Sequence, residues 1–178
     1  SYSVTGVQTC ALPIFVSANP TGPIHLGNGR GGPLGDALAE IFKKAGFEVF
    51  REFYVNDFGN QIKVLGHSIL GDEQAQYQGD YIDQLRLEIQ EKDPFLAGQQ
   101  GAKIILKKLI EPSMKSLGIL FDQYFLESSL HQEGWVEKVF KELKEKEFIF
   151  EREGALWFRA TAFGDEKEIG RASCRERV

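Results

Sequence analysis

A strand that runs into a helix through a glycine-rich turn is the most constraining feature of this sequence. Residues 15–49 read FVSANPTGPIHLGNGRGGPLGDALAEIFKKAGFEV, with a short apolar run before the turn. After the turn, apolar residues recur with helical spacing, which predicts an amphipathic helix that ends at Gly46. They are Leu34, Ala37, Leu38, Ile41, Phe42 and Ala45. Such a helix start presents unpaired backbone N–H groups and the positive end of the helix dipole, so the turn is a candidate phosphate site.

The turn carries the groups that a phosphate site needs. Gly22 and Gly27 let the backbone approach a ligand, and His25 and Asn28 place two hydrogen-bonding side chains three residues apart. This spacing predicts that both side chains, and the N–H groups that follow Gly27, point at one ligand. Because proline is tolerated only in the first turn of a helix, Pro33 predicts that the regular helix begins nearer Pro33 than His25.

A second strand is predicted after this helix. Residues 14–18 form the first apolar strand, and residues 47–55 alternate in the manner of a strand. The order strand, helix, strand predicts a parallel pair with a right-handed crossover. Ligands of such sheets bind at the carboxyl ends of the strands, where residues 17–22 and 56–60 are expected to lie.

Two interpretations remain open for Asn56 and Asp57. Both residues directly precede a predicted helix at residues 58–70, where either side chain can cap the helix start in a purely structural role. Their position at the carboxyl end of a strand favours a ligand contact equally.

The rest of the sequence predicts further helices, one strand and a hairpin. Helices are predicted at residues 81–91, 102–117 and 133–146. Strands are predicted at residues 119–126, 148–150 and 155–159. A break is predicted at residues 93–101, and Pro112 should kink or split the helix that contains it.

Length and composition suit one globular α/β domain. The 178 residues are 42% hydrophobic and 12% aromatic, and no apolar run reaches the roughly 18 residues that a membrane helix needs. Both cysteines, Cys10 and Cys174, lie near the ends, so no disulfide framework, zinc site or cysteine nucleophile is expected between them. The net charge of −5 means that any nucleic-acid contact needs a local basic patch.

Three stretches carry a resemblance to a known family. HLGN at residues 25–28, preceded by SANPTGP and followed by GRG, resembles the HIGH motif of class I aminoacyl-tRNA synthetases in its extended arginyl-tRNA synthetase form. REFYVNDFGNQI at residues 51–62 and GALWFRATAFGDEKE at residues 154–168 are similar to arginyl-tRNA synthetase segments in the same order. The alternatives are another class I synthetase, an HxGx nucleotidylyltransferase, or a non-catalytic nucleotide- or tRNA-binding module.

The resemblance implies a partial Rossmann-like fold of the bacterial enzyme type. Residues 15–70 would form the first half of the catalytic domain, and residues 71–168 its helical continuation and inserted segment with a β-hairpin. The implied activity is ATP-dependent activation of L-arginine to arginyl-adenylate and its transfer to tRNA(Arg). ATP would be a substrate together with Mg²⁺, without a tightly bound cofactor or a metal site on the protein. The resemblance also implies a cytoplasmic enzyme that makes no membrane contact and is monomeric at full length.

The resemblance assigns site residues by their positions in the motifs. The catalytic residues would be His25 and Asn28, although the family usually has histidine where this chain has Asn28. ATP would be bound by Pro20, Gly22, His25, Gly27 and Asn28. L-Arginine would be bound by Ser17, Asn19 and Glu127. A carboxylate such as Glu127 suits a planar guanidinium through paired charge-assisted hydrogen bonds, but Glu127 could instead only open the following helix.

The two ends of the sequence differ from the middle. Residues 1–14 and 169–178 contain VTGVQTCALPI and most of EIGRASCRERV, which resemble translated read-through of sequencing-library adapters. We therefore expect a gene fragment flanked by adapter sequence. Such a fragment would lack the KMSK-type loop and the anticodon-binding domain, and it would be inactive alone.

Overall fold

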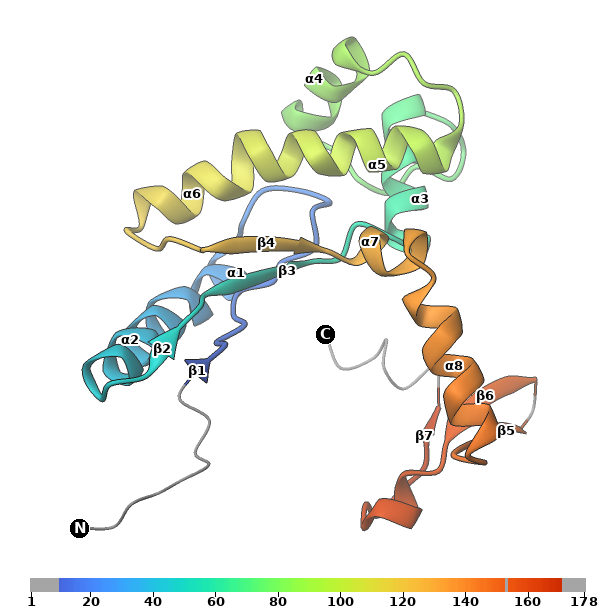
Figure 1. The fold of residues 1–178 in the computed structure, drawn as a ribbon. Helices are drawn as coiled ribbons and strands as arrows, with labels where there is room; N and C mark the ends of the chain where they lie inside the picture. Colours follow the sequence, from blue (N-terminus) through green and yellow to red (C-terminus); the bar gives the residue numbers. More distant parts are fainter. Residues whose placement is uncertain (1–9, 153, 171–178) are drawn as a thin grey trace. The chain divides into compact units, whose positions relative to one another are not determined.

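The computed structural model describes residues 10–152 and 154–170, which belong to two compact units, Ser1–Ser128 and Ser129–Val178 (Figure 1). Of the adapter-like residues 1–14 and 169–178, residues 1–9 and 171–178 lie outside the described residues. No helix in the described part of the chain is long and apolar enough to cross a bilayer.

The first unit begins with two short parallel strands, the first of which lies before the predicted range 14–18. Strand β1 (Cys10–Ala11) pairs in parallel with β2 (Glu48–Val49). A parallel bridge between Ile14 and Glu52 continues this pairing. The chain then leaves the sheet, because Val16 and Ser17 adopt left-handed φ angles of 64° and 43°. The parallel pairing confirms the predicted order of strand, helix and strand. The predicted strand at residues 14–18 is wrong, because only Ile14 pairs and the chain turns away at Val16.

Two helices connect these strands. The single turn α1 (Leu26–Gly29) is followed by the longer α2 (Gly31–Lys44). Helix α2 starts two residues before Pro33, which confirms the expected regular start, and Gly46 ends the connection with a φ of 91°. Because Pro33 has no N–H, its position in the first turn of α2 costs no hydrogen bond.

The large apolar residues of α2 are exposed, and its buried residues are small. The buried residues are Gly32, Gly35 and Ala39. A Cβ at Gly35 would lie 2.3 Å from the ring of Phe15, so the helix approaches the chain before the turn too closely for a larger side chain. The large apolar residues are 40–66% exposed and comprise Leu34, Leu38, Ile41 and Phe42.

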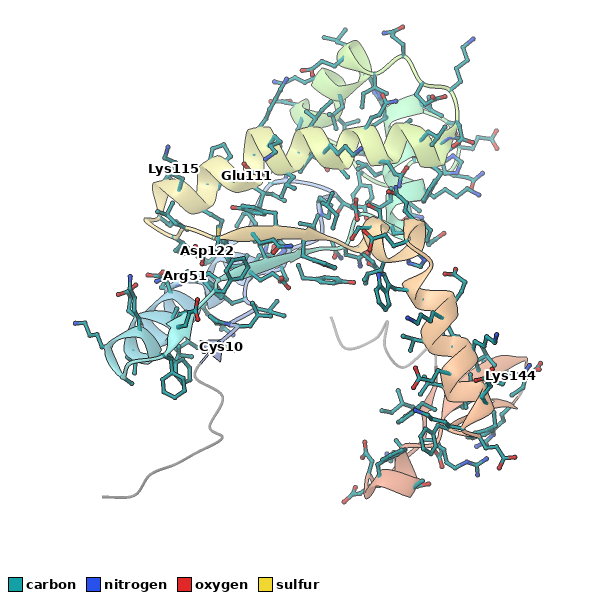
Figure 2. All side chains as sticks on the ribbon, viewed as in Figure 1. Cys10, Arg51, Glu111, Lys115, Asp122 and Lys144 are labelled. Carbon is teal, nitrogen blue, oxygen red and sulfur yellow. The ribbon has the colours of Figure 1, made fainter. Side chains whose placement is uncertain are left out.

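An ion-pair cluster holds α2 to the amino ends of the strands. The side chain of Arg51 pairs with Asp36 and Glu40 of α2. Its backbone N–H donates to Asp122 Oδ2 at 2.7 Å, and Figure 2 shows Arg51 and Asp122 close together. This cluster joins α2 to the chain segments just before β3 and β4, so Arg51 has a structural role.

A second two-stranded parallel sheet, β3–β4, contributes to the core of the unit. Strand β3 (Glu52–Val55) runs parallel to β4 (Gln123–Leu126), with Tyr54 opposite Phe125 and Val55 opposite Leu126. Strand β4 occupies only the second half of the predicted strand at residues 119–126. Three helices contribute to the core that covers Phe53 and Val55: α3 (Asn60–Leu70), α4 (Asp80–Glu88) and α5 (Pro94–Ile105).

The predicted break at residues 93–101 is wrong, because α5 begins there. Asp93 caps the helix by accepting from the N–H of Leu96 at 2.9 Å, and Pro94 occupies the first turn. Pro112 does not split the helix: α5 runs through a π-helical segment (Leu106–Ile110) directly into α6 (Glu111–Ser116), which has Pro112 in its first turn. Figure 2 labels Glu111 on α6.

The second unit contains the predicted hairpin. Helix α7 (Glu127–Gln132) starts in the first unit and leads towards α8 (Trp135–Glu145). Strands β5 (Ile149–Arg152) and β6 (Ala155–Phe158) pair antiparallel, which confirms the hairpin. A 3₁₀ turn (Ala160–Phe163) precedes a short third strand, β7 (Ile169–Gly170), which the sequence pattern does not predict.

Candidate active site at the carboxyl ends of the strands

The tetrapeptides at the carboxyl ends of β3 and β4 lie side by side in register. Residues 54–57 read YVND and residues 125–128 read FLES, and Val55 is opposite Leu126. One and two positions further on, the same register places Asn56 beside Glu127 and Asp57 beside Ser128. Hydrogen bonds between the side chains follow this register.

Asp57 binds across the strands. Its Oδ1 accepts from the backbone N–H of Ser128 at 2.8 Å, and its Oδ2 accepts from the Ser128 hydroxyl at 2.6 Å. The expectation that Asp57 caps the next helix is wrong, because the N-cap of α3 is Gly59 and has no side-chain cap. Asp57 is only 3% exposed, so its carboxylate depends on these bonds for the solvation that it loses on burial.

Asn56 contacts the carboxylate of Glu127. With its amide nitrogen turned towards Glu127, Asn56 donates to Glu127 Oε2 at 2.6 Å and to the carbonyl oxygen of Phe58 at 3.2 Å. Glu127 is half-buried and is also the first residue of α7. Both interpretations of Glu127 therefore describe its position, since it opens a helix and also lies at the carboxyl end of a strand.

The loop after the first strand is tied to the same edge of the sheet. Ser17 Oγ accepts from the backbone N–H of Tyr54 at 3.1 Å. Asn19 Nδ2 donates to Gln61 Oε1 at 2.6 Å, so this loop also contacts the first turn of α3. The structure thus brings Ser17, Asn19 and Glu127 to one group of adjoining segments. No role for Gln61 could be inferred from local sequence patterns, because its partner Asn19 lies 42 residues away.

An aromatic pair accompanies Glu127 on the sheet. The rings of Tyr54 and Phe125 stack with centroids 6.0 Å apart and planes 23° apart. Side chains alternate along a strand, so Tyr54 and Asn56 share one face, opposite to the face of Val55. Burial, with smaller contributions from the nearby carboxylates of Glu127 and Asp57, raises the pKa of Tyr54 to about 12. The two carboxylates, which make the smaller contribution to this pKa shift, also favour a bound cation.

His25 caps helix α1 with its own ring. Its Nδ1 accepts from the backbone N–H of Asn28 at 3.3 Å. In the neutral imidazole this bond places the proton on Nε2, which becomes a donor on an exposed side chain. A Cβ at Gly27 would lie 3.0 Å from His25 Cε1, so a glycine there gives the ring its room.

The expectation that the N–H groups after Gly27 point at a ligand is wrong. The N–H of Asn28 binds the His25 ring, and those of Gly29 and Arg30 donate to the carbonyl oxygens of His25 and Leu26. The exposed donor at this helix start is therefore the imidazole rather than the backbone.

Tyr81 of α4 anchors the loop that runs from Asn19 to His25. Its hydroxyl donates to the carbonyl oxygen of Thr21 at 3.1 Å, and a Cβ at Gly22 would lie 3.3 Å from that hydroxyl oxygen. Pro20 is buried beside this contact. Residues 20–28, which include every expected ATP-binding residue, thus form one continuous loop and helix start. Within residues 10–152 and 154–170, no group of three or more His, Cys, Asp or Glu side chains could hold a metal ion.

The relatives found by comparison with known proteins share one name, arginine--tRNA ligase. No family model matches the chain. The arginine--tRNA ligase of Citrifermentans bemidjiense is 42% identical over 177 residues, which cover 86% of this chain and 32% of that protein. The arginine--tRNA ligase of Nitratidesulfovibrio vulgaris is 41% identical over 93% of this chain and 34% of its own length. The chain therefore spans about a third of the length of the curated relatives it matches.

Solved structures agree in fold. An arginyl-tRNA synthetase structure from Campylobacter jejuni matches with a TM-score of 0.74 and 33% identity, over 89% of this chain and 39% of that one. The arginyl-tRNA synthetase of Thermus thermophilus matches with a TM-score of 0.58 over 90% of this chain and 32% of its own. Its 22% identity supports the fold alone.

Proposed function

The chain belongs to the arginyl-tRNA synthetase family, and we propose that the carboxyl ends of its strands supply the site where L-arginine and ATP react. The observation that supports this proposal best is the position of Glu127. Its carboxylate lies at the carboxyl end of β4, bound by Asn56 of the adjacent strand end. Ligands of parallel sheets bind at this edge.

The proposed reaction has two steps. The carboxylate of L-arginine attacks the α-phosphorus of ATP, which enters with Mg²⁺, and arginyl-adenylate forms as pyrophosphate leaves. The arginyl group then passes to the terminal ribose of tRNA(Arg), at its 2′-hydroxyl, and AMP leaves. Negative charge builds up on phosphoryl oxygens in the first step, so the protein must supply fixed donors rather than covalent chemistry.

His25 is the proposed donor to the phosphates. Its Nδ1 is held by the N–H of Asn28, so a neutral ring donates from Nε2. A donor that is already oriented costs no reorganisation when the transition state forms. Asn28 adds a side-chain amide that can donate without carrying charge.

L-Arginine would be recognised at both of its ends. The guanidinium would bind the Glu127 carboxylate beside the aromatic pair of Tyr54 and Phe125, since guanidinium groups also stack on aromatic rings. The α-ammonium would bind Asn19, beside Ser17. Because the amide nitrogen of Asn19 donates to Gln61, its carbonyl oxygen is the group oriented to accept from an ammonium.

The family supports the wider assignments. We propose that residues 15–70 form the first half of a catalytic domain and that residues 71–168 form its continuation and inserted segment. The partners would be L-arginine, ATP and tRNA(Arg), in the cytoplasm, with a monomeric full-length enzyme. Relatives at about 42% identity over 86% of the chain support arginine over another amino acid.

A segment exchange tests the proposal. The chain would replace the matching third of the Citrifermentans bemidjiense arginine--tRNA ligase, and arginine-dependent ATP–pyrophosphate exchange would be measured with tRNA present. We expect exchange, and we expect His25→Ala to lower its rate by about 100-fold or more, the usual cost of one transition-state donor. Lys43→Ala, at the far end of α2, is the control and should keep the rate. Near-normal exchange in the His25→Ala variant would rule out its proposed role.

A further inference from the structure

Asp57 has no part in the proposed contacts to substrate, yet it makes two hydrogen bonds to the residue that follows Glu127. Its carboxylate receives both the backbone N–H and the hydroxyl of Ser128. We propose that Asp57 is a positioning residue that fixes Glu127 for the guanidinium by holding Ser128. This inference rests on the proposed function, because it deepens the role given to Glu127.

The burial of the pair makes this link rigid. Asp57 is 3% exposed and Ser128 is 6% exposed, so water cannot readily replace either bond. Both bonds are charge-assisted, with lengths of 2.8 and 2.6 Å, which is the strong class of protein hydrogen bond. Losing one partner would leave a buried polar group unsatisfied, so the arrangement resists local movement.

The link acts on Glu127 through the backbone. Ser128 is the second residue of α7, and Glu127 is the first. A fixed N–H and hydroxyl at Ser128 fix the peptide that carries the Glu127 Cα, while Asn56 fixes the other end of the side chain at Oε2. Glu127 is therefore held at its backbone by Asp57 and at its carboxylate by Asn56, two consecutive residues at the end of β3.

The Asp57–Ser128 pair also holds together the chain segments that follow β3 and β4. Asp57 and Ser128 extend the β3–β4 register by two positions beyond Val55 and Leu126, although the strands themselves have ended. Asp57 thus keeps the two chain segments together where the sheet no longer does. Small displacements at such a point weaken a binding site, because an error of about 1 Å can cost on the order of 100-fold in rate.

A graded set of variants tests the proposal on the complete 178-residue chain. L-Arginine affinity would be measured by titration calorimetry at a temperature where each variant is folded by circular dichroism. We expect Asp57→Ala to weaken L-arginine binding by about 10- to 100-fold. Asp57→Asn should restore most of the affinity, because its carbonyl can accept from the Ser128 N–H and its amide can donate to the hydroxyl.

The Ser128 variants complete the test. Ser128→Ala removes one of the two bonds and should fall between wild type and Asp57→Ala. The double variant Asp57→Ala, Ser128→Ala should be no weaker than Asp57→Ala alone, since both substitutions break one link. Ile110→Val and Met114→Ala alter the buried core on other elements. These two controls should lower the melting temperature without changing the affinity for L-arginine.

The outcomes separate this inference from the proposed function. If wild type does not bind L-arginine, the proposed function fails and the inference fails with it. If wild type binds and Asp57→Ala binds equally well while melting at a lower temperature, the role of Asp57 is structural only and the inference alone is overturned. A core control that weakens binding as much as Asp57→Ala would also overturn it.

Discussion

Tyr54 is the residue whose protonation most directly reports the electrostatics of the site. Burial first, and then the carboxylates of Glu127 and Asp57, raise its pKa to about 12. The folded chain therefore holds this proton more tightly than the unfolded chain, whose tyrosines titrate near pH 10. The resulting stability is present below about pH 10 and is lost as the pH rises towards 12.

A titration with Tyr54→Phe measures this effect. We expect phenolate absorbance to show one fewer late-titrating tyrosine in the variant, and its unfolding free energy to fall less steeply between about pH 10 and 12. Tyr124→Phe is the matched comparison. Burial and Glu111 also raise the pKa of Tyr124 to about 12, so this variant should likewise lose one late-titrating tyrosine. An unchanged alkaline titration in Tyr54→Phe would contradict the position assigned to its phenol.

At the residue scale, the sequence identified the correct neighbourhood but not every contact. The position of Asn56 and Asp57 at a strand end followed from local patterns, as did the place of His25 at a helix start. The true partner of Asp57 is Ser128, which is 71 residues away, so helix capping was the nearest local explanation for a carboxylate that in fact binds across the sheet. Strand register, rather than spacing along the chain, determines that pair.

At the scale of elements, the backbones of α3 and α5 lie so close together that only glycine fits at two contact positions. A Cβ at Gly66 would lie 1.5 Å from the carbonyl oxygen of Pro94, and one at Gly98 would lie 1.9 Å from that of Ile62. Both obstacles are backbone atoms, so a side-chain rotation cannot relieve them. The two helices therefore meet at a pair of glycines that no larger residue can replace without moving a helix.

Alanine substitutions test this contact. We expect Gly66→Ala and Gly98→Ala each to lower the free energy of unfolding by about 3 kcal/mol or more, the upper range for overpacking. The control is Gly31→Ala in α2, where a Cβ meets nothing within 4 Å and stability should be kept or slightly raised. Urea denaturation measures all three. A loss at Gly66 no larger than that at Gly31 would show that the helices do not pack this closely.

Periodicity predicted α2 correctly as a helix, but its large apolar residues are exposed in the structure. Large apolar residues normally mark the buried face. Here a Cβ at Gly35 would meet Phe15 and one at Gly32 would meet Ile119, so the buried residues of α2 are small while the large ones are exposed. The start of α5 was missed for another reason: Asp93, Pro94 and Gly101 favour a break by residue type, although Asp93 caps the helix, Pro94 lies in its first turn and Gly101 packs closely on α3.

At the scale of the whole molecule, the order of elements was predictable and the long-range grouping was not. Residues 71–128 join residues 10–70 in one compact unit, through the packing of α5 on α3 and the pairing of β4 with β3. The proposed site lies within this unit. Its proposed arginine-binding residues come from two separate segments, residues 17–19 and Glu127, whereas its proposed phosphate-binding residues come from the single stretch 20–28 that the motif marked.

Recognition of a guanidinium at Glu127 is the central claim, and comparing two ligands tests it most directly. L-Citrulline matches L-arginine in shape but has no positive charge. Calorimetric titration of the chain should show L-arginine binding at least about tenfold more tightly than L-citrulline, with Glu127→Gln removing most of that difference, because a charge-assisted hydrogen bond contributes about 1.5–3 kcal/mol. Equal affinity for the two ligands, or a preference for L-arginine that survives Glu127→Gln, would contradict it.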